Sequence, residues 1–197
     1  MKSTLMQAGL AAALGLVTLG AQAHFRLESP ASWIEQDDKG DPQKMAPCGG
    51  TMADGGTRTG IVTEVVGGSM LRIAIDETVF HPGHYRVALA RRINLLPGDP
   101  EAVLKDMENG LRSDYAIIAE PALPPVLQDG LWQNQVRRTG PQETEVRIPN
   151  FDCEGCVMQV LQFMEEHPGF REGGFSYHHC AILNIKADAS LPMDSGW

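Results

Sequence analysis

The sequence predicts an all-β fold, an immunoglobulin-like antiparallel β-sandwich with long loops and one short helix in an insertion. Short segments of alternating apolar and polar residues recur along most of the chain, and sequences rich in Gly, Pro and Asp separate them. We find no internal repeat and no low-complexity tract. Many short strands with turns between them and a single helical segment are typical of two packed sheets.

The first 23 residues have the pattern of a secretory signal peptide. Lys2 precedes an apolar stretch over residues 10–19, which is too short to span a bilayer, and Ala21-Gln22-Ala23 places small residues where a signal peptidase cuts. We therefore expect residues 1–23 to be removed and residues 24–197 to form one domain with a sizeable core. The residue after the cut is not cysteine, so we expect no lipid anchor. We expect a secreted or periplasmic protein that is a monomer and has no membrane anchor.

Seven segments are predicted to be strands because their residues alternate or form short apolar, β-branched runs. They are residues 24–28, 59–66, 70–75, 85–90, 143–148, 157–163 and 175–186. Gly67-Gly68 indicates a hairpin whose turn needs a positive φ. Residues 31–56, which are rich in Gly, Asp and Pro, predict a long ordered loop held through Cys48.

Residues 91–142 break the strand rhythm and predict an insertion between strands, because they have too few apolar residues for a core of their own. Within them, Asp99 can cap a helix, Pro100 suits its first turn and Gly110 suits its end. We therefore expect the one short helix over residues 99–110.

Charge and cysteine content limit the possible partners and the compartment. The formal net charge of -9 leaves no basic face for phosphates, so we expect no nucleic-acid partner, whereas a neutral polysaccharide or a cation is compatible. Four cysteines in an exported chain predict two disulfides, of which Cys153 and Cys156 can form one and leave Cys48 with Cys180. A redox or zinc CxxC is the alternative, but no second CxxC or βαβ pattern accompanies it.

The histidines predict a metal site. The mature chain has His24, His81, His84, His167, His178 and His179. The predicted cut would make His24 the first residue, so that its free α-amine and a ring nitrogen could bind one ion. His81 and His84 flank a Pro-Gly turn and His178 and His179 are adjacent in a strand, so at most one of each pair should face a given site. The alternative is that these are surface or hydrogen-bonded core histidines.

The donor set favours copper. One terminal amine and two imidazole nitrogens form a T-shaped, nearly planar set, which suits Cu(II) because this ion prefers tetragonal nitrogen and oxygen donors. Zinc would prefer a tetrahedral site with a further ligand.

At this point the chain resembles the lytic polysaccharide monooxygenases. The similarity lies in His24, in a histidine just before the strand Tyr85-Arg86-Val87, and in a closing strand with Tyr177 three residues before Cys180. Cys153–Gln159 is similar to the CxxCxxQ segment of the chitin-binding type-4 branch. The runs 40–50, 81–85 and 177–180 also resemble a bacterial group of monooxygenase-like secreted proteins.

The resemblance implies a histidine brace. His24 would give its amine and a ring nitrogen, His81 the third nitrogen, and Tyr177 would lie at the axial position. His84 would shape the pocket or replace His81 as ligand, and His178 or His179 could hydrogen-bond a copper-bound oxygen. Two positions depart from the family's pattern: Phe175 stands where some members carry an oxygen-positioning Gln or Glu, and Ile182 where Asp or Gln often follows Cys-Ala.

Three functions follow as expectations. The first is a copper-dependent oxidoreductase that cleaves a chitin- or cellulose-like polysaccharide with an external electron donor. The second is a copper-binding protein for capture or delivery that has no polysaccharide partner. The third is a disulfide-linked binding module whose histidines are incidental.

Overall fold

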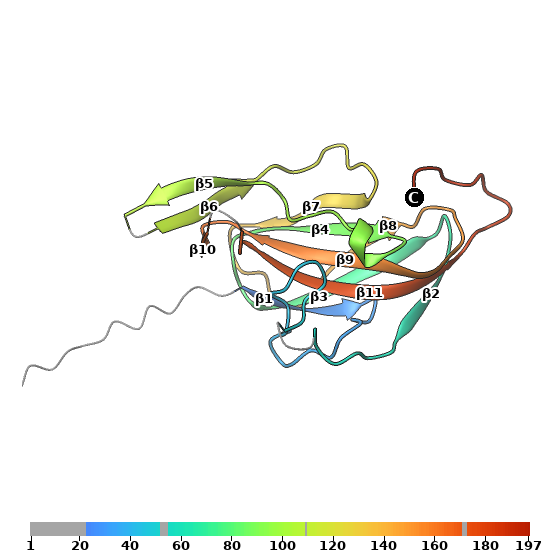
Figure 1. The fold of residues 1–197 in the computed structure, drawn as a ribbon, viewed down its shortest axis with the longest axis horizontal. Coiled ribbons are helices and arrows are strands. Elements are labelled where there is room, and N and C mark those ends of the chain that lie inside the picture. The colour runs from blue at the N-terminus through green and yellow to red at the C-terminus, as the bar shows by residue number, and fades with distance from the viewer. Residues whose placement is uncertain (1–22, 52–54, 109, 171–172) are drawn as a thin grey trace, which may run out of the picture.

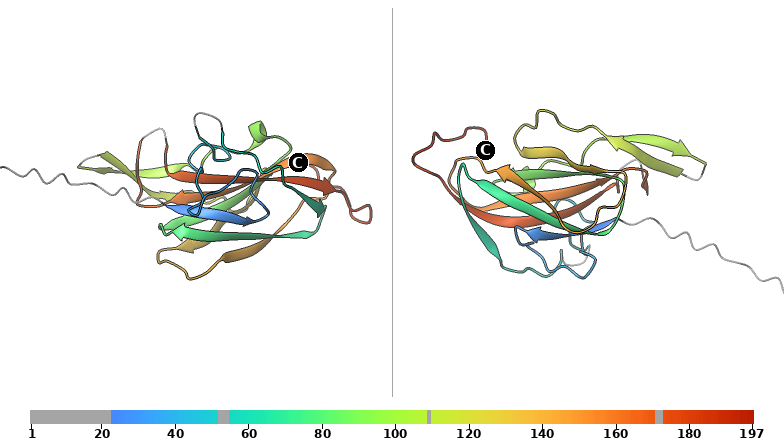
Figure 2. Two further views of the ribbon diagram at one scale, coloured as in Figure 1. Left: turned by 90° about the horizontal axis from the view of Figure 1, so that it is seen from below. Right: turned by 180° about the vertical axis from the view of Figure 1, so that it is seen from behind.

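The computed structural model describes residues 23–51, 55–108, 110–170 and 173–197, so the predicted signal peptide lies outside the described residues except for Ala23. Two sheets pack face to face and confirm the all-β sandwich (Figures 1 and 2). One has the order β1 (His24–Ser29), β3 (Met70–Val79), β8 (Gln142–Arg147). The other has the order β2 (Val62–Val66), β11 (Ser176–Lys186), β9 (Cys153–Met164), β4 (Gly83–Ala90), β7 (Val126–Asn134).

A third, small sheet covers the outer face of the five-stranded sheet. It consists of β10 (Pro168–Gly169), β6 (Gly110–Ala116) and β5 (Ala102–Met107). Ala116 of this sheet packs with Leu161, Phe163 and Phe175 in a second buried cluster. Strand β4, which lies between β9 and β7, is therefore buried along its whole length, because its inner face meets the other large sheet and its outer face lies beneath the insertion.

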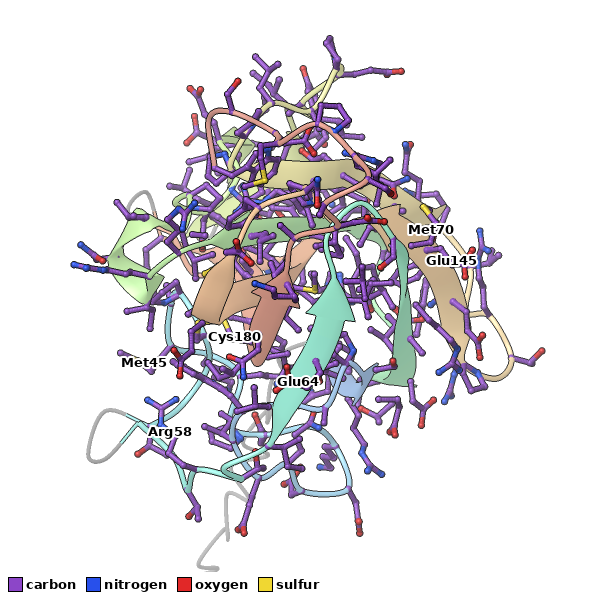
Figure 3. All side chains as sticks on the ribbon, turned by 90° about the vertical axis from the view of Figure 1, so that its right-hand side faces the viewer. Met45, Arg58, Glu64, Met70, Glu145 and Cys180 are labelled. Carbon is purple, nitrogen blue, oxygen red and sulfur yellow. A yellow bond between two sulfur atoms is a disulfide. The ribbon has the colours of Figure 1, made fainter. Side chains whose placement is uncertain are left out.

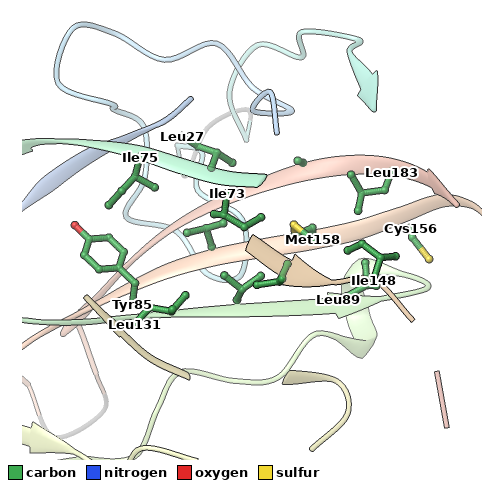
Figure 4. Close-up of a cluster of buried hydrophobic side chains, with 14 of the residues drawn as sticks. Leu27, Ile73, Ile75, Tyr85, Leu89, Leu131, Ile148, Cys156, Met158 and Leu183 are labelled. Atoms are coloured by element: carbon green, nitrogen blue, oxygen red, sulfur yellow. The ribbon is translucent and has the colours of Figure 1, made fainter. Parts of the chain in front are cut away.

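The main core lies between the two large sheets. Figure 4 shows Leu27, Ile73 and Ile75 from the three-stranded sheet facing side chains of the five-stranded sheet. The facing set includes Tyr85, Leu89, Met158 and Leu183, all fully buried. Alternation along each strand places these residues on one face, which is the pattern that predicted the sandwich.

The predicted helix over residues 99–110 is wrong. Residues 102–107 form β5, which pairs antiparallel with β6 and aligns Met107 with Gly110. The described part of the insertion has one helical turn, a 3-10 helix over Ile93–Leu95, which lies before the predicted position. The insertion also supplies β7, which pairs with β4 in the five-stranded sheet.

Tertiary contacts explain the failure of the helix signal. Asp99 caps no helix, because its carboxylate accepts a hydrogen bond from His178 at 2.8 Å. Ala102 and Leu104 pack against the buried cluster beneath the small sheet. Burial and strand pairing thus outweigh a local preference that is worth only a fraction of a kcal/mol per residue.

The predicted hairpin across Gly67-Gly68 is also wrong, although Gly68 does have a positive φ of 80°. β2 pairs in parallel with β11, whereas β3 pairs with β1 and β8 in the other sheet. The two glycines carry the chain between sheets: Gly67 N–H donates to Lys186 and Gly68 N–H to Ile148, both at 2.8 Å. The five-stranded sheet is therefore mixed and not purely antiparallel.

Both expected disulfides are present. Cys48–Cys180 joins the long loop before β2 to β11, and Figure 3 shows Cys180 beside the part of this loop that carries Met45. Cys153–Cys156 lies within the first residues of β9. No helix in the described part of the chain is long and apolar enough to cross a membrane.

The two disulfides should differ in their effect on stability. Their cysteines are 132 and 3 positions apart, and the chain entropy removed from the unfolded state grows with loop length. Replacing Cys48 and Cys180 by alanine should lower the free energy of unfolding by about 5 kcal/mol, against about 2 kcal/mol for the Cys153 and Cys156 pair. Urea denaturation of the two double variants measures this, and equal losses would contradict it.

Candidate metal centre

The two predicted ligands His24 and His81 lie at the same end of the sandwich. His24 begins β1 and is aligned with Val79 at the end of β3, and His81 follows Val79 by two residues. This end, where β1 starts, also carries β10 (Figure 1). Gly83 then starts β4 with a φ of 149°, and a Cβ there would fall on the carbonyl oxygen of Phe163, so only glycine lets the chain turn beside β9.

The ring of His24 is held by a carboxylate. Its Nε2 lies 3.0 Å from Oδ2 of Asp41, and because a carboxylate only accepts, Nε2 carries the proton. The lone pair is then on Nδ1, which is buried and has no hydrogen-bond partner among the described residues. His178 and His179 leave a buried Nδ1 in the same state, but only His24 stands at the predicted cleavage site.

His81 presents the opposite nitrogen. It is buried, and its Nδ1 donates to the carbonyl oxygen of Pro82 at 3.1 Å. Burial lowers the pKa of His81, although the bond to Pro82 and the charges of Glu166 and Glu165 act in the other direction. The ring is therefore neutral near pH 7, and its lone pair is on Nε2.

His167 lies against this lone pair. Its Nδ1 is 3.2 Å from Nε2 of His81, and the two ring centroids are 5.0 Å apart. Burial, the neighbouring His81 and the positive charge of Lys44 lower the pKa of His167 to about 4. No role was predicted for His167 from the sequence, although His167-Pro168-Gly169 repeats His81-Pro82-Gly83 and could have drawn attention to it.

Tyr177 contacts the His24 ring. The two centroids are 5.4 Å apart in an edge-on arrangement, and Nζ of Lys44 lies 5.9 Å from the tyrosine ring. Burial and the charge of Asp41 raise the pKa of Tyr177 to about 12, so the phenol stays protonated at neutral pH. This contact agrees with the axial position that the resemblance implies, which stays a prediction.

His84 lies elsewhere. It is on the outer face of the five-stranded sheet, where its ring stacks on Phe163 and its Nε2 is 3.5 Å from Oδ1 of Asp129. The next residue, Tyr85, points into the main core, on the face that also carries Tyr177. Of the two candidates in the Pro-Gly turn, His84 therefore lies on the outer face, whereas His81 contacts His167.

His178 and His179 face opposite sides of β11, as expected for neighbours in a strand. His178 donates from Nε2 to Asp99 on the outer face at 2.8 Å. Burial raises the pKa of Asp99, but the hydrogen bond and charge of His178 outweigh it and the net pKa is lowered. His179 donates from Nε2 to the carbonyl of Phe25 at 3.0 Å and is fully buried.

A cleft of about 990 Å³ also lies on the outer face, between the insertion and the start of β11. Leu96, Leu104 and Phe175 are among its apolar lining residues, and Asp99 and Glu101 are its acidic ones. Neither His24 nor His81 lines it, so the cleft and the metal-site candidates are on different parts of the molecule.

The side chains alone do not form a metal cluster: in the described ranges, no three His, Cys, Asp or Glu residues are grouped so that they could hold an ion. A brace needs only two imidazoles, because the third nitrogen is the α-amine. The hydrogen bonds to Asp41 and Pro82 leave Nδ1 of His24 and Nε2 of His81 as lone-pair donors, which is how partners around metal ligands set their tautomers. Each of the two rings thus keeps one nitrogen with a lone pair, and a shared ion between them stays a prediction.

Comparison with known proteins adds no family assignment. Neither a protein-family model nor a curated protein matches this chain.

The buried His179 should make the metal-free protein less stable in acid. Burial lowers its pKa to about 4, whereas the unfolded chain takes up the proton near pH 6.5. Between these values the unfolded state binds more protons, so the free energy of unfolding should fall as the pH drops from 6.5 to 4, by on the order of 3 kcal/mol from this residue. His179→Gln keeps an N–H donor without titrating, and urea denaturation at several pH values should give it a shallower dependence than wild type; identical slopes would refute the assignment.

Proposed function

We propose that the processed chain is a secreted copper-binding protein whose ion is held by the amine and Nδ1 of His24 and by Nε2 of His81. One observation carries the proposal: the residue at the predicted cleavage site has a buried, unpaired Nδ1 whose ring is fixed by Asp41. Amine and Nδ1 of one histidine can close on the same ion. No other histidine of the chain offers both groups.

Processing is essential to this site. In the uncut chain the nitrogen of His24 is an amide joined to Ala23, and an amide nitrogen does not donate a lone pair as an amine does. The two disulfides are compatible with export to an oxidising compartment, where signal peptides are removed.

Copper is the metal that the donors favour. All three proposed ligands are nitrogens, and such sets bind Cu(II) more tightly than other divalent first-row ions. Burial lowers the pKa of His81, so its imidazole offers Nε2 without first losing a proton there.

The first candidate activity is the oxidative cleavage of a chitin- or cellulose-like polysaccharide. Bound copper would supply one-electron chemistry with oxygen and an external electron donor. The protein's own contribution would be to orient His24 through Asp41 and to cover one side of its ring with Tyr177. The neutral phenol brings no charge to the site.

The second candidate is copper capture or delivery without polysaccharide chemistry, and two observations favour it. Phe175, at the position of an oxygen-positioning residue, is buried with Leu161 and Phe163 on the outer face of the sheet. His167 lies against the donor nitrogen of His81, where a monooxygenase would keep space. Oxidised oligosaccharides, formed by copper-loaded protein with a reductant, distinguish the first candidate from the second.

The proposal requires a free amine at His24. Mature protein that begins with His24 should bind one Cu(II), and the same protein with one extra residue before His24 should lose the tight site. Isothermal titration calorimetry compares the Cu(II) affinities of the two forms, which differ only by the one extra residue. Equal Cu(II) affinities of the two forms would contradict both candidate functions, the copper-dependent cleavage and the copper capture or delivery.

Replacement of the second ligand should weaken binding selectively. His81→Ala removes one of three nitrogens and should lower Cu(II) affinity by about 100-fold or more, which corresponds to about 3 kcal/mol. His84→Ala is the matched control, because His84 lies in the same turn but on the outer face. If Cu(II) affinity falls in His84→Ala and is unchanged in His81→Ala, then His84 and not His81 is the second imidazole ligand.

A further inference from the structure

A polar pocket lies where the chain passes from one large sheet to the other. β7 is an edge strand of the five-stranded sheet and β8 an edge strand of the three-stranded sheet, and residues 135–141 connect them. The pocket has a volume of about 310 Å³, at the lower end of the range for small-molecule sites. It is lined by one residue of β7, two residues of β8 and the loop between them: Trp132, Gln142, Glu143, Arg138, Thr139, Gly140 and Pro141.

Gln142 gives this pocket a side chain whose hydrogen-bonding groups are unused. The residue is 5% exposed, and neither Nε2 nor Oε1 has a hydrogen-bond partner in the described part of the chain. Buried side-chain amides are usually paired, because an unpaired one has lost its hydrogen bonds to water without replacing them. An amide left in this state in the wall of a pocket can pair with a ligand that enters the pocket.

The fold pairs its other buried glutamines better. Of the four buried glutamines that the structure describes, Gln142 alone has both groups unpaired. Gln159 shows the usual arrangement: its Nε2 donates to the carbonyl of Pro47 at 2.8 Å, and its Oε1 accepts from Nη2 of Arg86 at 3.2 Å. The state of Gln142 is therefore particular to the pocket.

Trp132 supplies an apolar wall. Its ring is partly buried, packs against the main core and meets the ring of Tyr85 edge-on at 5.4 Å between centroids. Its φ of 48° lies in the left-handed region, which a bulky side chain rarely adopts. Unfavourable backbone conformations of this kind occur preferentially at functional sites, where they fix a side chain in one position. The indole is thus presented to the pocket on a rigid support.

The lining side chains select the chemistry of the ligand. Glu143 is already engaged, because its carboxylate accepts from Nε and Nη2 of Arg72 at 2.9 and 2.6 Å. The amide of Gln142 donates and accepts at the same time, as a hydroxyl group does. Two adjacent hydroxyls can therefore pair with both of its groups, while a face of C–H groups packs on the ring of Trp132. A sugar ring carries both features.

We propose that this pocket binds a single sugar residue, with two neighbouring hydroxyls on the amide of Gln142 and the C–H face of the ring against Trp132. Arg138, which is exposed on the loop, can donate to a further hydroxyl. Neither His24 nor His81 lines the pocket, so the inference does not depend on copper binding.

Two substitutions of buried glutamines test the assignment. Gln142→Met keeps the length of the side chain but removes the amide, so it should abolish sugar binding. It should also stabilise the free protein, because two unpaired buried groups are lost. Gln159→Met is the matched control: it leaves the partners at Pro47 and Arg86 unpaired and should destabilise the protein, but sugar binding should stay as in the wild type.

The experiment uses mature protein without copper and D-glucose, D-galactose and D-mannose as probes. Saturation-transfer nuclear magnetic resonance detects contact, a titration gives the affinity, and urea denaturation gives the stability. We expect at least one sugar to bind the wild type, and its affinity to fall by about 10-fold or more in Gln142→Met, whose urea midpoint should rise.

Three outcomes would overturn the proposal. The first is that none of the three sugars binds the wild type. The second is an unchanged affinity in Gln142→Met. The third is a lower urea midpoint in Gln142→Met, which would show that the amide holds the fold together. The copper titration of the processed chain is a separate measurement, so failure of the proposed function is distinguishable from failure of the sugar site.

Discussion

The antiparallel alignment of His24 with Val79 is the constraint on which the candidate site depends. Chain ends are usually poorly ordered, but the residues that follow the predicted cleavage position are fixed by their neighbours. Phe25 and Leu27 are buried in the main core, and the N–H of Phe25 donates to Oε1 of Gln43 at 3.2 Å. His24 is thereby held beside core residues and opposite Val79, the last residue of β3, which precedes His81 by two positions.

The long loop between β1 and β2 does more than connect strands. It supplies Asp41 to the ring of His24 and Gln43 to the backbone of β1, and the carbonyl of Gln43 accepts from the N–H of His178 in β11. Cys48–Cys180 fixes the same loop to β11. The loop therefore joins the two large sheets next to the site and sets which nitrogen of His24 keeps its lone pair.

Local sequence patterns predicted where the strands lie better than they predicted which strands pair with each other. Alternation and short apolar runs located β1, β3, β4, β8, β9 and β11, because each buries at least one face in the core. The same reasoning paired β2 with β3, since no local signal shows that β2 lies parallel to β11. It also read Asp99 and Gly110 as helix ends, whereas Asp99 is held by a residue 79 positions away.

The site was predicted in part for the same reason. The family resemblance implied His24, His81 and Tyr177, and the structure places Tyr177 against His24, whereas the metal site itself stays a prediction. The repeated His-Pro-Gly sequence could have drawn attention to His167, but only the pairing of β10 with β6 shows that it lies against His81. Asp41 escaped notice because nothing in a glycine-rich loop indicates that one carboxylate will reach a ring 17 residues earlier.

The position of Ala23 bears on the order of events in the making of this protein. Ala23 is fully inaccessible and belongs to the main core, and His24 beside it is 2% exposed. A peptidase cuts a peptide bond that lies in its active site as an extended segment. Once β1 is docked in the sandwich, it would not release this segment. If the chain is cut there, the enzyme has to act while β1 is still free, so maturation comes before the final packing of the sandwich and an uncut molecule that has folded would be trapped without its terminal amine.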